Sequence, residues 1–127
     1  MKANQAAIYV AAEKLLTIAV PMINRMPRQH ASMIVGEMIV RDLRDVMAYI
    51  STALKNKDER GMYINAVSVK TDVLRTDFKV LHSVSKITTC HFFTDGQYAE
   101  VIDLLVEIEN NRSRWAKATA EMAAKRK

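Results

Sequence analysis

The sequence predicts an all-α fold, an antiparallel up-down-up-down four-helix bundle made by a single domain of residues 1–127. The length of 127 residues suits one domain with one core. The chain holds only three Gly and two Pro, too few for the turns that an all-β fold needs about every 8–12 residues. In four long segments, apolar residues recur at intervals of three and four, the spacing of one helix face. Four such amphipathic helices bury their stripes most economically in one shared core.

The first two helices are expected at about residues 5–24 and 29–54. Pro27 separates them, because proline lacks a backbone donor and breaks a helical pattern. The apolar stripe of the first helix is Ile8, Ala11, Leu15, Ile18 and Met22. The stripe of the second is Gly36, Ile39, Leu43, Val46, Met47, Ile50 and Leu54. A polar turn, residues 55–61, follows.

The third and fourth helices are expected at about residues 60–84 and 95–123. The stripe of the third is Tyr63, Ala66, Val67, Leu74, Phe78 and Leu81, which Val73, Val80 and Val84 are expected to widen. A loop over residues 85–93 leads to the fourth helix, and Thr94 with Gln97 forms a capping box at its start. The stripe of the fourth is Tyr98, Val101, Ile102, Leu105, Ile108, Arg112, Trp115 and Thr119.

No membrane-spanning or export segment is expected. A spanning helix needs about 20 mostly apolar residues, whereas the longest uncharged runs, residues 3–12 and 15–24, have ten each. Glu13 and Lys14 divide these runs, which also spoils a secretory signal. The sequence therefore predicts a cytoplasmic protein in which the single cysteine, Cys90, is a reduced thiol.

The sequence favours a protein that is not an enzyme and holds no metal or cofactor. A di-iron bundle needs Glu-x-x-His on two helices, and no Glu here has a His three residues later. No glycine-rich phosphate loop occurs, and one cysteine cannot build a cysteine-rich zinc site. The adjacent Cys90 and His91 leave a Cys–His nucleophile pair as a minor alternative to a plain loop thiol.

The net charge of +5 is concentrated at one end of the chain. Residues 1–109 contain 13 Lys or Arg and 13 Asp or Glu, so their charges cancel. Residues 110–127 carry six cations, Arg112, Arg114, Lys117, Lys125, Arg126 and Lys127, against Glu121 alone. Basic residues at a helix C-terminus offset the helix dipole, which is the plain interpretation of the tail. The functional interpretation is contact with phosphates or with an acidic partner.

The candidate binding residues before the terminal Lys125, Arg126 and Lys127 are Arg75 and Lys79 on the third helix and Arg112, Arg114 and Lys117 on the fourth. Arg112 interrupts an apolar stripe, where burial of a charge costs free energy unless the charge is paired or solvated. It is expected either to extend toward the bundle end or to serve an interface between subunits. Trp115 fits the core and equally an oligomer interface, and His30 fits a neutral cap or an interface residue.

The order of several short motifs resembles one family. Met26-Pro27-Arg28-Gln29-His30, preceded by Pro21 and Ile23, is similar to the Ile-Pro-Arg-Lys-His segment of the Avd proteins, the accessory variability determinants of diversity-generating retroelements. The further matches are Tyr63 with Ala66, Val73-Leu74-Arg75 followed by Phe78, Thr94 with Gln97, and Trp115-Ala116. The resemblance spans roughly residues 15–120 and reaches a wider set of four-helix proteins encoded as intervening sequences within large ribosomal RNA genes.

The resemblance implies a non-enzymatic four-helix protein that forms a ring-like homopentamer with a basic surface. Such a protein binds the reverse transcriptase of its element and RNA or DNA, and it supports mutagenic retrohoming. By motif position, Arg28 and Arg75 correspond to basic residues of the family, and His30 and Trp115 to further motif positions. This chain departs from the strongly basic family in its neutral residues 1–109. The alternative is a structural bundle of the intervening-sequence type without a dedicated nucleic-acid role.

Overall fold

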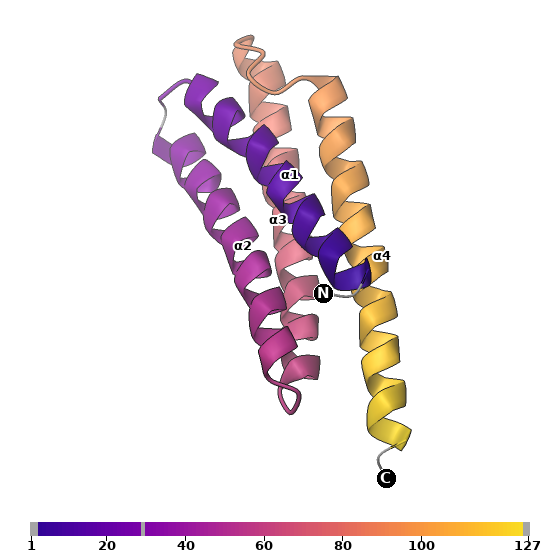
Figure 1. Ribbon diagram of the computed structural model, residues 1–127. Coiled ribbons are helices and arrows are strands. Elements are labelled where there is room, and N and C mark those ends of the chain that lie inside the picture. Colours follow the sequence, from indigo (N-terminus) through magenta and orange to yellow (C-terminus); the bar gives the residue numbers. More distant parts are fainter. Residues whose placement is uncertain (1–2, 29, 126–127) are drawn as a thin grey trace.

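The computed structural model describes residues 3–28 and 30–125, and this part of the chain forms four helices and no strand (Figure 1). The helices are α1 (Ala3–Arg25), α2 (His30–Lys55), α3 (Arg60–Thr88) and α4 (Asp95–Lys125). Short connections join them, so that each helix runs back along its predecessor (Figure 1). The predicted all-α four-helix bundle is therefore confirmed.

The four helices stand at the corners of a square. Backbone contacts link α1 with α2, α2 with α3, α3 with α4, and α4 with α1. Within the described ranges the diagonal pairs, α1 with α3 and α2 with α4, make no backbone contact. Every helix thus has two neighbours and one face turned to the centre, which is the arrangement expected of an up-and-down bundle.

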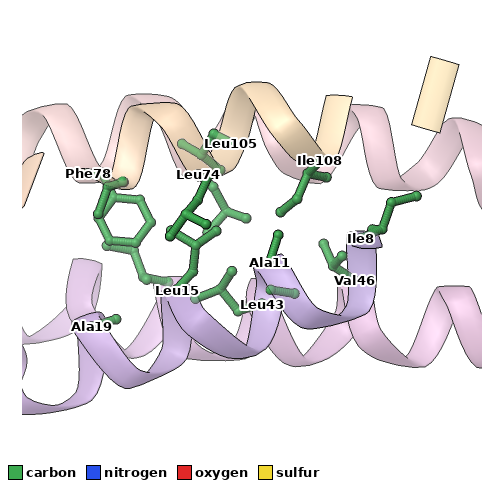
Figure 2. Packing of buried hydrophobic residues seen from close by; sticks show 14 of the residues in the cluster. Ile8, Ala11, Leu15, Ala19, Leu43, Val46, Leu74, Phe78, Leu105 and Ile108 are labelled. Atoms are coloured by element: carbon green, nitrogen blue, oxygen red, sulfur yellow. The ribbon is translucent and has the colours of Figure 1, made fainter. Parts of the chain in front are cut away.

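The central space is filled by aliphatic side chains from all four helices and by the ring of Phe78 (Figure 2), and the same buried cluster extends to Phe92, Phe93 and Trp115. Leu15 of α1, Leu43 of α2, Leu74 and Phe78 of α3, and Leu105 of α4 are completely buried. These are the residues at which the three-and-four spacing of the sequence places the inner face. The hydrophobic effect over this core holds the helices together, since isolated helices of this length are marginal in water.

The turn between α2 and α3 is closed by side chains of its own residues. The Asn56 side chain donates to Glu59 Oε2 at 3.0 Å and accepts the Glu59 backbone N–H at 3.2 Å. Arg60 donates to the carbonyl oxygens of Ala53 at 2.7 Å and Leu54 at 3.2 Å. The guanidinium thus satisfies carbonyl groups that the end of α2 would otherwise leave unpaired.

The connection between α3 and α4 is shorter than the predicted loop over residues 85–93. Helix α3 continues to Thr88 and ends at Thr89, which adopts a left-handed conformation with φ 58°. The extra turn is held because Ser85 is buried and its hydroxyl accepts the Phe93 N–H at 3.0 Å. The predicted capping box is confirmed: the Gln97 N–H donates to Thr94 Oγ1, and the Thr94 N–H donates to Gln97 Oε1, each at 3.1 Å.

One face of α3 differs from the prediction. Val73 and Val80, which the sequence suggested would widen the core stripe, are exposed on the outer side of the helix. The core is already filled on that helix by a narrower set that includes Val67, Leu74 and Phe78. Helix α3 is therefore apolar on two opposite sides, and only one of them is covered by the bundle.

Helix α1 is long and apolar enough, by length and composition, to cross a membrane. In the bundle its apolar stripe, including Ile8, Leu15 and Met22, is buried against the other helices. Glu13 and Lys14, in the middle of the helix, are exposed. The bundle thus covers one side of α1 and leaves Val10 and Val20 of the same helix exposed.

Candidate nucleic-acid interface

The structure distributes the predicted basic residues over three places rather than gathering them in one. Arg28 lies in the connection between α1 and α2. Arg75 and Lys79 lie in the middle of α3, and Arg114 and Lys117 lie in the second half of α4, toward the opposite end of the bundle from Arg28 (Figure 1). A polyanion that touches all three places must therefore run along the bundle.

Arg75 and Lys79 project into solvent. They are four residues apart, so they lie one helical turn from each other on α3. Both are exposed, and within the described residues neither takes part in an ion pair. Cations of this kind are available to an external anion without first breaking an internal contact.

Arg112 is different, because its charge is compensated inside the chain. Its side chain is only 14% exposed, and its Nε and Nη2 atoms donate to the Glu109 carboxylate at 2.7–3.0 Å. Ser68 of α3 adds a longer hydrogen bond to the same carboxylate at 3.5 Å. The two-pronged pairing satisfies the guanidinium, so the interruption of the apolar stripe serves the contact between α3 and α4.

The end of α4 carries the strongest exposed positive charge. Helix α4 continues beyond the start of α1 (Figure 1). Arg114, Lys117 and Lys125 are exposed there, and Glu121 is the one acidic residue after Glu109 in the described part of the helix. Arg126 and Lys127 of the predicted basic tail lie outside the described residues.

Trp115 forms part of a hollow of about 560 Å³ at this end of the bundle. The ring itself is 4% exposed, so the prediction of a core position fits the structure better than a free interface residue. The first residues of α1, the end of α2 and the last turns of α4 surround it. The lining residues are Ala3, Asn4, Gln5, Leu54, Lys57, Arg60, Trp115, Ala118, Thr119, Met122 and Ala123.

Lys57 and Arg60 are residues that the sequence analysis did not single out. In the sequence they belong to a polar turn, residues 55–61, that contains three basic and two acidic residues. The bundle brings this turn beside the second half of α4, so the two cations border the hollow next to Trp115. The turn and the second half of α4 are about 55 residues apart in the sequence, so no local pattern predicts their contact. The sequence indicates only that the short turn makes α2 and α3 antiparallel.

At the opposite end, an aromatic cluster joins α3 to the start of α4. His82 stacks on Tyr98 with ring centroids 4.2 Å apart, and Phe93 meets both rings edge-on. His82 Nε2 lies 2.7 Å from Asp95 Oδ1, and Lys86 Nζ lies 3.4 Å from the same oxygen. These two contacts, the one with His82 first, lower the pKa of the Asp95 carboxyl. The cluster anchors the first turn of α4 on α3.

Between α2 and α3 a lysine is held by two carboxylates. Lys70 Nζ lies 2.9 Å from the buried Asp42 and 3.1 Å from Asp45. The hydrogen bond with Asp42 is the main reason that the pKa of Lys70 is raised. Asp77 Oδ2 is buried nearby with no hydrogen-bond partner among the described residues. Burial, together with the negative charge of Asp42, raises the pKa of Asp77.

The remaining candidates from the sequence are Cys90, His91 and His30. Cys90 and His91 are both exposed in the connection before α4, and no hydrogen bond joins their side chains in the described structure. Within residues 3–28 and 30–125 no group of three His, Cys, Asp or Glu side chains could hold a metal ion. His30 is the first residue of α2, and its side chain lies outside what the structure describes.

Comparison of the chain with protein-family models, with curated proteins and with solved structures finds no match.

Proposed function

We propose that this chain is a non-enzymatic, cytoplasmic accessory protein that acts as a basic homo-oligomer. It binds a reverse transcriptase together with template RNA and cDNA, in the manner that the resemblance to the Avd proteins implies. Its task is then to support mutagenic retrohoming. The proposal that the chain binds nucleic acid rests on the exposed end of α4. Arg114, Lys117 and Lys125 are exposed there, and Glu121 is the one acidic residue in the same described stretch.

Binding of this kind depends on the number of phosphates contacted. Each Lys or Arg that neutralises a phosphate releases counterions, so the affinity falls steeply with salt. One chain with a net charge of +5 offers few contacts. Five copies, as the resemblance implies, carry a net charge of about +25, and their α4 ends supply the contacts that one copy lacks. Arg75 adds a cation on α3, whereas Arg112 is held by Glu109.

Nucleic-acid binding is tested by removing two cations at a time. The variant Arg114→Ala/Lys117→Ala is compared with Lys14→Ala/Arg44→Ala, which removes the same charge from exposed positions of α1 and α2. We expect only the first variant to lose RNA affinity, by about tenfold at low salt, and to reduce the salt slope by about 1–2. An equal loss in both variants would mean that net charge alone, and not this end of α4, attracts RNA.

The partner and the assembly are tested separately. We expect the full chain to co-purify with the reverse transcriptase encoded beside its gene at low salt, and light scattering to give a mass near five times 14.4 kDa. Repeated failure to co-purify would count against the accessory role. A reverse transcriptase gene and two near-identical repeats that differ at adenines beside this gene would support it.

A structural bundle without a nucleic-acid role is the second candidate. The internal pairing of Arg112 with Glu109 favours it, because that cation stabilises the contact between α3 and α4. The balanced charge of residues 1–109 also favours it. This candidate predicts RNA binding that is undetectable, or unchanged when Arg75 and Arg114 are replaced by alanine.

A further inference from the structure

The uncovered apolar face of α3 forms a continuous seam along the helix. Its exposed large members are Met62 (58%), Val69 (62%), Val73 (39%), Val80 (43%) and Ile87 (80%). The half-buried Ala66 and the exposed Thr76 and Ser83 complete the series. The intervals between successive members are four and three residues throughout, which is a heptad repeat over more than three heptads. At 1.5 Å per residue the seam is about 37 Å long.

This repeat is separate from the core stripe of α3. The core residues Leu74, Phe78 and Leu81 lie on the other side of the helix and are completely buried. Of the two hydroxyl residues in the seam, Thr76 already donates its hydroxyl to the Asp72 carbonyl of its own helix. Val73, Val80 and Ile87 follow one another at intervals of seven residues, so they share one heptad position. All three are β-branched, as is typical of the a position in paired helices.

From this seam we infer that α3 pairs with α3 of a second copy of the chain in an antiparallel, twofold contact. A copy placed with its Thr76 opposite Val73 also places its Val80 opposite Val69. The same register sets its Ser83 opposite Ala66 and its Ile87 opposite Met62. Large residues then meet large ones at both ends, and the two small residues meet each other. The contact is self-complementary, as twofold symmetry requires.

The charges beside the seam select the antiparallel direction. Asp72 and Lys79 flank the seam on one side. In the antiparallel register Asp72 of one chain lies within a turn of Lys79 of the second copy, and this pairing occurs twice. A parallel, in-register pair would instead bring Asp72 close to Asp77 of the second copy, a repulsive contact. Lys70 and Asp77, on the other flank, also have opposite signs, but Lys70 is already held by Asp42 and Asp45.

This inference goes beyond the proposed function and does not depend on it. A twofold contact joins two chains into a dimer, or two of the five-membered rings proposed above into a pair of rings, so it doubles the mass of the unit that it joins at concentrations where the contact forms. Lys79 then contacts the second copy, and the nucleic-acid contacts rest on Arg75, Arg114 and Lys117. Neither of the following experiments contains RNA or a reverse transcriptase, so the two proposals fail separately.

The first experiment is disulfide trapping of the full chain in a Cys90→Ser background. Chains with Val69→Cys are mixed with chains with Val80→Cys and oxidised. We expect the mixed 69–80 disulfide to form and the 69–69 disulfide not to form, since an antiparallel pair separates the two copies of residue 69 by about 16 Å along the axis. Val10→Cys, equally exposed on α1, serves as the control for random collision. Dominant 69–69 linkage would indicate parallel pairing and overturn the inference, and so would yields no higher than those of the control.

The second experiment exchanges the flanking charges. We expect Lys79→Asp and Asp72→Lys each to weaken association at least tenfold in sedimentation equilibrium, and the double variant to restore most of it. Val69→Glu, which lies outside the core, should halve the assembled mass while the helix content and melting temperature of the chain remain close to those of the parent. An assembled mass that is the same for the parent chain and for Val69→Glu at micromolar concentration would overturn the inference.

Discussion

The burial of the Asp77 carboxylate lowers the stability of the fold. Its Oδ2 atom is buried without a hydrogen-bond partner among the described residues, and its pKa is raised by burial and by Asp42. The folded state therefore holds the proton of Asp77 more tightly than the unfolded state does. As pH rises through the pKa of the folded form, this contribution to stability is lost, and at neutral pH the charged carboxylate destabilises the fold.

We therefore expect Asp77→Asn to raise the melting temperature at pH 7 by a few degrees. The gain should shrink as the pH falls and vanish below the unfolded pKa of about 3.8, where both chains carry a neutral side chain. Thermal unfolding followed by circular dichroism between pH 3 and 8 measures this, at two protein concentrations so that association is recognised. Asp103→Asn, on an exposed residue of α4, is the control. A gain that did not depend on pH would contradict the assignment.

Three features at the residue scale differ in how far they can be predicted from the sequence. The capping box of Thr94 and Gln97 was predictable because both partners lie within four residues and the chemistry is local. The orphaned Asp77 was not, since its environment arises only when α2 packs against α3 and brings Asp42 near it. The pairing of Arg112 with Glu109, three residues earlier, was within reach of the sequence as a pair on one turn.

Among the helices, α4 offers a direct test of which face is the core. Leu105 is completely buried, whereas its neighbour Val106 is 43% exposed. We expect Leu105→Ala to lower the free energy of unfolding by about 2–5 kcal/mol, because it removes buried methyl groups and leaves a cavity. Val106→Ala should cost well under about 1 kcal/mol. Urea denaturation measures both, and similar losses would mean that α4 is rotated from the orientation described.

In α3, the spacing of apolar residues predicts the helix but does not show which of its faces is buried. Its position as a helix was predicted from the three-and-four spacing, although the segment is rich in valine. The assignment of Val73 and Val80 to the core was wrong, because two apolar stripes on opposite sides of one helix obey the same spacing. Which of the two is covered depends on the volume available between the other helices, and that is a property of the assembled bundle.

For the whole molecule, the distribution of charge is more informative than its sum. By count, the excess of positive charge lies in residues 110–127, and the structure shows Arg114, Lys117 and Lys125 exposed there. The hollow beside Trp115, with Lys57 and Arg60 at its border, was not foreseen, because three helix ends and the last turns of α4 must meet to form it. Arg28, Arg75 and Arg114, treated together in the sequence, lie in different parts of the bundle.

The terminal cations give a prediction for the intact protein. We expect replacement of Lys125, Arg126 and Lys127 by alanine to reduce RNA affinity severalfold at low salt and to leave the melting temperature unchanged. The reason is that Lys125 is exposed beyond the packed part of the bundle. Fluorescence anisotropy at several salt concentrations measures the affinity, and replacement of Glu121 by alanine, which removes the nearby negative charge, should act in the opposite direction. An unchanged affinity would identify the tail as a charged helix end without a binding role.

The extension of α4 beyond the other helices also determines where the backbone opens to solvent most easily. Its last turns, from Ala120 onward, contain only exposed residues in the described part, so no core packing protects their backbone. Their amide hydrogens therefore exchange with solvent at the rate of a fraying peptide helix, while those around Leu105 exchange only when the bundle opens. We therefore expect hydrogen exchange to be faster at the basic end than around Leu105, and a bound polyanion to slow exchange at the basic end first.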